Sequence, residues 1–402
     1  MEKSSANSKA VLLSIVILIA CLAGIASDIY APSLPAISAS LKTPISLVQW
    51  SMAIYMLGLS LSQLIYGPLS DAFGRRPALA LGLLIFLCGS AVCYFASDID
   101  LLIYGRLIQG CGAGACAALW RSTFRDVFAG EELAVYGSYL SVIMVFVVPT
   151  APALGGYFQE YFGWQSSFIF LAVYAVVALL MVIFLFKETS QHHDRSRLTP
   201  SFIIVTYGQL LKNRVFMGYT ISVFLTYGAF FSWFAVGPIL LIDRLEYSPV
   251  QFGWVSFAAL GGAMALGSFT NARLVRYFGL YAMLRFGWSM TFAAGIMMLL
   301  AHWVVGVSAL FIIIPVLMFY LGSTFIFANT FAGAFAKVGK IAGFAGALYG
   351  ALQIAGASVL GAVVSYLPDN NQVPLACVYI FCTAAAWIVY KTVVRPIELA
   401  DS

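Results

Sequence analysis

The chain has too little charge for a water-soluble protein of its length. Asp, Glu, Lys and Arg together make up 9% of its 402 residues, whereas a soluble domain carries about 25%. Hydrophobic residues make up 62%, and apolar runs of about 20 residues, long enough to span a bilayer, fill most of the sequence. The composition therefore excludes a set of soluble domains and predicts an integral membrane protein.

The sequence also lacks the motifs of hydrolysis, metal binding and nucleotide binding. Its three histidines form no HExxH or Ser-His-Asp pattern, and its seven cysteines lie in apolar runs without a CxxC pair. There is no GxxxxGK[ST] segment for nucleotide binding. The net charge is +5, but the basic residues form no arm or stripe that could bind nucleic acid. We therefore expect no enzyme activity, no cofactor, no metal site and no nucleic-acid partner.

Hydropathy divides the chain into twelve candidate transmembrane helices. Their approximate ranges are 10–34, 47–66, 78–96, 101–120, 134–158, 166–186, 215–240, 250–270, 282–301, 304–328, 342–366 and 374–393. With a cytoplasmic N-terminus, 18 of the 21 Lys and Arg residues fall in one set of connections and adjoining helix ends. Two (Lys42, Arg244) fall in the other set, and Arg106 lies inside a span. The positive-inside rule then places both termini in the cytoplasm and supports an even number of spans.

The longest polar stretch, from Lys187 to Arg214, follows the sixth span and divides the helices six and six. We predict an N-terminal six-helix bundle at 1–189, a cytoplasmic linker at 190–213 and a C-terminal six-helix bundle at 214–402. Residues 67–79 and 271–284 each place Arg and Gly after an inward-running helix, which indicates a weak internal repeat. Two repeated bundles related by a pseudo-two-fold axis are typical of a secondary transporter, although composition alone also allows a channel or a membrane enzyme.

The segment GPLSDAFGRRP at 67–77 carries the most specific pattern. Its glycines allow a tight turn, its aspartate suits the positive end of a neighbouring helix, and its arginines can pair with acids of facing elements. The spacing of Gly67, Asp71, Gly74, Arg75 and Arg76 resembles the cytoplasmic signature of the major facilitator superfamily. The resemblance implies that contacts of this segment form when the cytoplasmic side closes and break when it opens.

Two charged residues are predicted inside the membrane. Arg106 and Gln109, three apart in the fourth span, share a helix face and match the superfamily's second motif. Asp28 lies in the first span, roughly 10 Å below its outer end, and Arg106 lies roughly 8 Å below the start of its own span. The matched depths suggest a contact, so we predict that Asp28 is the proton-coupling carboxylate and Arg106 its counterpart. The alternatives are that Arg106 reaches the outer headgroups and that Asp28 lies in an outer loop.

The fifth span resembles the motif of the superfamily's antiporter branches. Pro152, Gly155 and Gly156 fit its spacing, whereas Ser138, Val147 and Ala151 stand where glycines are expected. Pro and Gly here bend the helix and permit close contact with the other half. Together with DIYAPSLP in the first span and residues 121–134 and 342–368, these segments resemble the Bcr/CflA branch of proton-coupled multidrug exporters.

Aromatic and amide side chains could line a substrate cavity, since aromatic faces suit flat or cationic molecules. For any one of them, packing against lipid or another helix is the alternative. The substrate-binding candidates are Tyr30, Tyr55, Gln109, Tyr139, Tyr227, Phe231, Trp233, Tyr320 and Gln353, with Phe230, Phe327, Asn329 and Tyr349 as further cavity candidates.

The sequence thus predicts an all-α major facilitator protein that exports small amphipathic molecules in exchange for protons. We expect it to be a monomer in the bacterial inner membrane, with a small-molecule substrate, protons and the lipid bilayer as its partners. The rival hypotheses are a dedicated exporter or importer of one metabolite, such as a siderophore, sugar or amino acid, and a polytopic membrane enzyme.

Overall fold

The computed structural model describes residues 2–128, 130–190, 199–336 and 342–400, and within these ranges the chain is helical without strands. The first half contains α1 (Glu2–Asp28), η1 (Ala31–Ser33), α2 (Leu34–Leu41), α3 (Ile45–Phe73), α4 (Arg75–Tyr94), α5 (Ile99–Val127), α6 (Gly130–Val147), α7 (Thr150–Phe162) and α8 (Gln165–Phe184).

The second half continues the helical pattern after a short helix, α9 (Pro200–Lys212). It contains α10 (Arg214–Pro238), η3 (Ile239–Arg244), α11 (Pro249–Phe257), η4 (Ala258–Ala263), α12 (Met264–Val305), α13 (Ala309–Phe335), α14 (Ala342–Ser365), α15 (Val373–Val389), η6 (Tyr390–Val394) and α16 (Arg395–Ala400). The segments η3, η4 and η6 are π-helical turns that continue neighbouring helices.

The described residues contain eleven apolar helical runs long enough to cross a membrane. The longest, Pro249–Val305, has 57 residues, and its backbone leaves the helical conformation at Gly279, where φ is +76°. Gly279 therefore separates two crossings, as the predicted spans 250–270 and 282–301 require. With this division, the described runs agree with the twelve predicted crossings, and the predicted all-α membrane fold is confirmed.

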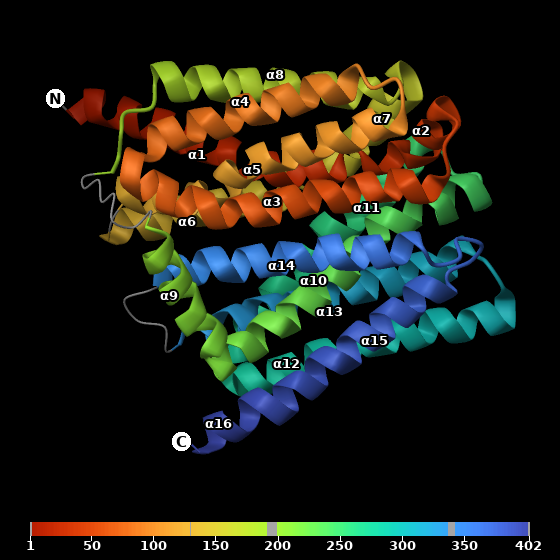
Figure 1. Cartoon of the computed structure of the whole chain (residues 1–402). Helices are drawn as coiled ribbons and strands as arrows, with labels where there is room; N and C mark the ends of the chain where they lie inside the picture. Colours follow the sequence, from red (N-terminus) through yellow and green to blue (C-terminus); the bar gives the residue numbers. More distant parts are fainter. Residues whose placement is uncertain (1, 129, 191–198, 337–341, 401–402) are drawn as a thin grey trace.

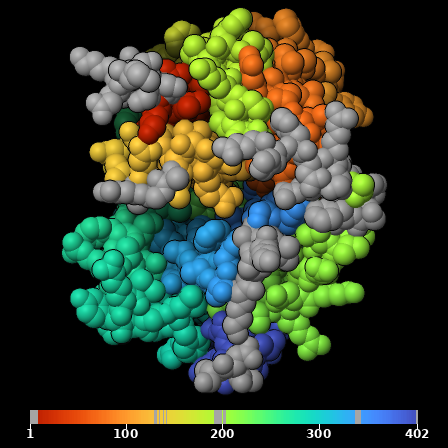
Figure 2. Space-filling model, turned by 90° about the vertical axis from the view of Figure 1, so that its left-hand side faces the viewer, coloured from red at the N-terminus to blue at the C-terminus, as the bar shows by residue number. Residues whose placement is uncertain are grey.

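The two halves of the sequence occupy different parts of the molecule. In Figure 1, α1 to α8 lie in the upper part, whereas α10, α12, α13, α14 and α15 lie below them. Both termini and α9 lie at the left of this view, which we call the α9 end. Figure 2 looks onto this end, with first-half helices in red to yellow above second-half helices in teal to blue. The helix α9 falls within the predicted linker, and the exact division at 189 and 214 stays a prediction.

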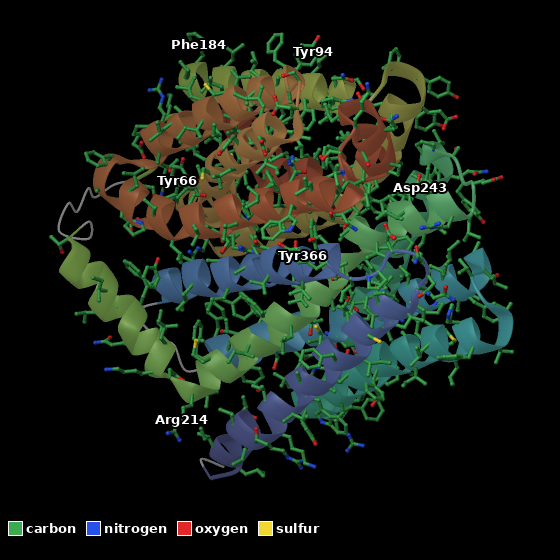
Figure 3. The ribbon with its side chains drawn as sticks, turned by 45° about the vertical axis from the view of Figure 1, so that its right-hand side comes forward. Tyr66, Tyr94, Phe184, Arg214, Asp243 and Tyr366 are labelled. Atoms are coloured by element: carbon green, nitrogen blue, oxygen red, sulfur yellow. The ribbon has the colours of Figure 1, made fainter. Side chains whose placement is uncertain are left out.

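The outer surface of the helices is rich in exposed apolar side chains. Phe184 is 75% exposed and Tyr94 38%, and both project from the upper surface in Figure 3. Monomeric soluble proteins rarely expose apolar patches of this extent, whereas lipid covers them without cost. The chain is therefore a multi-pass membrane protein.

Candidate functional site

The first transmembrane span is interrupted directly after Asp28. The helix α1 ends at Asp28, a single 3-10 turn follows, and α2 begins at Leu34. Pro32 and Pro35 cause this interruption, because each lacks an N–H and clashes with a helical carbonyl four residues earlier. The break frees backbone carbonyls inside the membrane, where polar side chains can reach them.

Asp28 is buried beside a hydroxyl group. The residue is 6% exposed, and its Oδ1 accepts a hydrogen bond of 2.5 Å from the Ser27 hydroxyl. Asp28 is therefore a buried acid at the point where the first span is interrupted.

Arg106 in α5 is fully buried against two tyrosine rings. Its Cζ atom lies 4.1 Å from the ring centroid of Tyr55 and 4.8 Å from that of Tyr30. Its Nη1 atom donates to the Ala26 carbonyl at 3.2 Å and to Gln109 Oε1 at 2.5 Å. Its Nε and Nη2 atoms have no hydrogen-bond partner, so the guanidinium keeps donors available for a further acceptor.

A glycine in α5 makes this arrangement possible. A Cβ atom at Gly110 would overlap the carbonyl oxygen of Tyr55, so only glycine lets α5 approach α3 so closely. The approach places the Tyr55 ring beside Arg106, one turn away on α5. The Gln109 amide in turn donates to Ser90 of α4 at 2.8 Å, which fixes its oxygen toward Arg106.

The structure brings Tyr30, Tyr55, Arg106 and Gln109 together, and Asp28 lies two residues after the Ala26 carbonyl that Arg106 contacts. We call these five residues the coupling cluster. Asp28 and Arg106 do not form an ion pair among the contacts of the described residues. Instead, Arg106 bonds to the carbonyl of Ala26, two residues before Asp28. The expected direct contact between Asp28 and Arg106 is therefore not formed in this structure, although both lie near the end of α1.

A cavity of about 650 Å³ lies at the α9 end. Residues of α3, α4, α5, α6, α9, α13 and α14 line it, so both halves contribute to its wall. Gln353, a predicted substrate residue, and Tyr349 are part of the lining. Gln63 on the facing helix α3 also lines it, and its Oε1 atom is buried without a hydrogen-bond partner.

The other predicted substrate residues lie outside the lining of this cavity. Tyr227 stacks on Phe230 with ring centroids 5.5 Å apart, and the Tyr320 hydroxyl donates to the Phe230 carbonyl at 3.0 Å. Phe231 packs on Phe234.

Two further substrate candidates differ in burial: Trp233 is buried in the protein interior, whereas Tyr139 is exposed. The Trp233 indole donates to Ser256 at 3.1 Å and stacks on Phe252. Tyr139 is 57% exposed on the surface of α6. The structure therefore does not bring Trp233 or Tyr139 together with the coupling cluster or the cavity.

The predicted cytoplasmic signature forms an ion-pair network at the α9 end. Arg75 contacts Asp71 at 2.8 Å and Asp126 of α5 at 3.1 Å. Gly74 supplies the positive φ of +103° between α3 and α4, while Gly67 lies on the cavity wall. The Arg76 guanidinium donates to the Ile183 carbonyl of α8.

Glu188, which the sequence interpretation missed, binds the start of α4. Its carboxylate accepts hydrogen bonds from the backbone N–H groups of Arg75 at 2.9 Å and Arg76 at 3.0 Å. Partial burial alone would raise the pKa of Glu188, but N–H bonds from Ser190, Arg75, Arg76 and Thr189 outweigh it and lower the pKa. The carboxylate is thus held charged at the positive end of the helix.

The opposite end of the molecule is closed by contacts between the halves. A Cβ at Gly156 in α7 would overlap the carbonyl oxygen of Pro249 in α11, and one at Gly155 would overlap that of Ile29. Pro152 lies in the same contact, since its carbonyl faces Gly253 of α11. The Gln49 amide of α3 also donates to the Ala235 carbonyl of α10 at 2.8 Å.

Arg121 was predicted as a basic residue of a helix end and as part of the branch-like segment 121–134, but not as a cavity residue, and Gln63 was not predicted at all. Both line the cavity. A signal for Arg121 was present, because it lies 15 residues after Arg106 in α5 and so on a similar side of the helix, about 60° away. No sequence pattern in α3 distinguishes Gln63 from the other uncharged polar residues of that helix, which are one further glutamine and several serines.

Comparison with known proteins identifies the family. The model of the Major Facilitator Superfamily matches residues 16–359. The uncharacterized MFS-type transporter YdgK of Bacillus subtilis is 32% identical over 362 residues, which cover 89% of this chain and 88% of that protein. A bicyclomycin resistance protein homolog of Haemophilus influenzae is 25% identical over 364 residues, which cover 88% of this chain and 89% of that protein.

A solved structure has the same fold. The xylose transporter XylE of E. coli, in a partially occluded inward open conformation, aligns with a TM-score of 0.70 at 12% identity, covering 94% of this chain and 99% of that chain. The predicted family is confirmed, and the relative named for bicyclomycin resistance supports the Bcr/CflA-type branch. The chain therefore belongs to the Major Facilitator Superfamily, and it is a membrane transporter rather than an enzyme.

Proposed function

We propose that this transporter exports small amphipathic molecules in exchange for protons by alternating access. The observation that carries the proposal is the separation of two sites. A drug-sized cavity lies at the α9 end, and a buried carboxylate and guanidinium lie in the coupling cluster. The relative named for bicyclomycin resistance supports a drug as cargo.

Asp28 carries the exchanged proton in this proposal. Exchange needs a group that binds a proton in one step and releases it in another, and Asp28 is a buried carboxylate at a break in its helix. When the Asp28 carboxylate moves toward Arg106, the unpartnered Nε and Nη2 atoms of the guanidinium stabilise the ionised form of Asp28. In the present conformation Asp28 accepts its hydrogen bond from Ser27, while Arg106 donates to Ala26 and Gln109.

Alternating access uses the two ends of the molecule. In the present conformation α7 and α11 close the end opposite α9, while the cavity occupies the α9 end. Closing the α9 end brings the second-half helices toward Asp71, whose present partner is Arg75 of the same signature. We propose that Gly67, Asp71, Gly74, Arg75 and Arg76 close this end, and that Pro152, Gly155 and Gly156 close the other.

The distribution of Lys and Arg supports a cytoplasmic α9 end. We propose a monomer in the bacterial inner membrane with both termini in the cytoplasm.

A drug panel tests the proposal most economically. A hypersusceptible bacterial strain that expresses the protein should tolerate several unrelated amphipathic compounds, and a protonophore should abolish this tolerance. Tolerance of a single compound would favour a dedicated metabolite exporter instead. Tolerance of none, with the protein present in the membrane, would contradict drug export.

A further inference from the structure

The cavity at the α9 end has a net positive wall. Three arginines, Arg75, Arg121 and Arg125, and one acid, Asp71, line it, which gives a net charge of +2. Arg75 is neutralised by contacts with Asp71 and Asp126. Arg121 and Arg125 have no acidic partner among the residues that the structure describes. The excess charge therefore belongs to these two side chains, which face the space that a substrate would fill.

Arg121 is presented between aromatic groups of the two halves. Its Cζ atom lies 4.4 Å from the ring centroid of Trp120, and its charge acts on the Tyr349 phenol of α14. Tyr349 is itself fixed by a contact of 3.1 Å with the Thr330 hydroxyl and by edge-to-face packing on Phe331. A planar guanidinium in this setting is suited to a carboxylate or sulfonate on an aromatic ring.

The cavity wall also offers an uncharged hydrogen-bond acceptor. Gln63 Oε1 is buried without a partner, and Gly350 of α14 leaves room for this amide beside it. Gln353 lies one turn further along α14 and also lines the cavity. A buried acceptor without a partner is costly unless a ligand supplies a donor, so a hydroxyl or N–H on the substrate fits this position.

We propose that the cavity binds aromatic molecules that carry a negative charge, with Arg121 as the residue that recognises the charge and Gln63 as an acceptor for a substrate donor. This inference rests on the proposed function, because it takes the cavity as the substrate site. It narrows the cargo to anionic amphipathic molecules and disfavours the cationic drugs that the aromatic content alone would allow. A cation would meet two uncompensated arginines and no free carboxylate on the described wall.

Two dyes with the same xanthene frame and opposite charge provide the test. Fluorescein carries a carboxylate and a phenol, whereas rhodamine 6G is a cation whose carboxyl is esterified. Binding of each dye to the purified protein in detergent is measured by fluorescence anisotropy. We expect fluorescein to bind at least tenfold more tightly than rhodamine 6G, and Arg121→Gln to weaken fluorescein binding about tenfold.

Matched variants separate recognition by Arg121 from general effects of charge. Arg276→Gln removes one exposed cation outside the cavity lining and should leave both affinities within twofold of the wild type. Arg121→Glu should reverse the preference between the dyes. Thermal unfolding of each variant establishes that it is folded.

Three outcomes would overturn the inference: rhodamine 6G binding as tightly as fluorescein, Arg121→Gln leaving fluorescein binding unchanged, or neither dye binding. Binding needs no proton gradient, so the test is independent of coupling. If cells export cationic compounds in a proton-dependent manner but not anionic ones, the proposed function stands and this inference fails. If no compound of either charge is exported, the proposed function itself fails.

Discussion

A buried carboxylate and a buried guanidinium lie in one cluster here without touching. The sequence indicated both residues, because charge inside an apolar span is costly and usually functional. It could not indicate that Arg106 would bond to a carbonyl freed by the break after Asp28, since that bond depends on how α1 ends. Nor could hydropathy orient Tyr139, because α6 is apolar on all sides and its pattern marks no inner face.

The contact between Arg106 and Tyr55 gives a prediction at the residue scale. Tyr55→Phe keeps the ring over the guanidinium and loses only the hydroxyl bond to the Ala23 carbonyl, so transport should stay within about threefold of wild type. Tyr55→Leu removes the ring. A desolvated cation–π contact contributes about 2 kcal/mol, which corresponds to about 30-fold in rate. Transport into inverted vesicles measures both variants, and equal activities would mean that the ring does not position Arg106.

At the scale of single elements, helix ends and close helix contacts carry the proposed gating. The sequence predicted the glycines at the α4 start and in α7, because glycine and proline stand out at fixed spacing. Glu188 was not predicted, because it lies in a polar stretch among other charged residues. Only folding brings its carboxylate to the N-terminus of α4. A residue distant in sequence from the helix that it binds has no local signature.

Glu188 gives a prediction with a defined pH dependence. Because its pKa is lowered in the folded protein, its stabilising effect is present above the pKa of an unfolded glutamate, about 4.3. The effect is lost as pH falls through the lower folded value. At neutral pH Glu188→Ala should cost about 0.5–1 kcal/mol, a helix-capping effect reduced by solvent exposure. Thermal unfolding from pH 8 to pH 3 measures it.

The difference in Tm between wild type and Glu188→Ala should be constant from pH 8 to about pH 5 and should shrink below the ordinary glutamate pKa. Glu188→Gln is the control, since it keeps an oxygen acceptor and cannot titrate in this range. A difference that disappears already near pH 6 would contradict the proposed contacts.

The contact of α7 with α11 gives a second prediction for an element. Gly156→Ala places a methyl group against the Pro249 carbonyl, so the end opposite α9 should close poorly and transport should fall about tenfold or more. Gly262→Ala is the matched control, because a Cβ there meets no atom within 4 Å.

Chemical labelling reads out this closure directly. In a cysteine-free background, Gln49→Cys introduces a thiol at a buried position where the halves meet. Maleimide should label this thiol faster in the Gly156→Ala variant than in Gly262→Ala. Equal labelling rates would show that the α7–α11 contact does not close this end.

For the whole molecule, hydropathy and charge predicted the number of transmembrane helices better than the residues at which these helices begin and end. Twelve spans follow from apolar length alone. In the structure the eighth and ninth spans form one continuous helical run, Pro249–Val305, which Gly279 divides into two crossings. The ends were less predictable, because α3 and α5 continue beyond their apolar runs to Phe73 and Val127. Two lining residues, Tyr349 and Gln353, were predicted, but the cavity as a whole was not, since its wall combines seven helices (α3, α4, α5, α6, α9, α13 and α14) through packing that no single segment encodes.

Orientation gives a prediction for the whole molecule. Single cysteines at exposed Lys212 in α9 and at exposed Ser97 between α4 and α5 replace the native residues in a cysteine-free variant. Because the positive-inside rule places α9 in the cytoplasm, a membrane-impermeant maleimide should label Ser97→Cys in intact cells. It should label Lys212→Cys only after the cells are broken, and labelling of Lys212→Cys in intact cells would invert the proposed topology.

The most direct test of the account is substrate-induced proton release from the purified protein in weakly buffered detergent solution. Addition of an exported compound from the drug panel should release protons from the wild type, because the proposed mechanism has Asp28 give up its proton when substrate binds. Asp28→Asn should bind the same compound within about tenfold of wild-type affinity and release none. Proton release of normal size from Asp28→Asn would contradict the assignment of Asp28 as the coupling group.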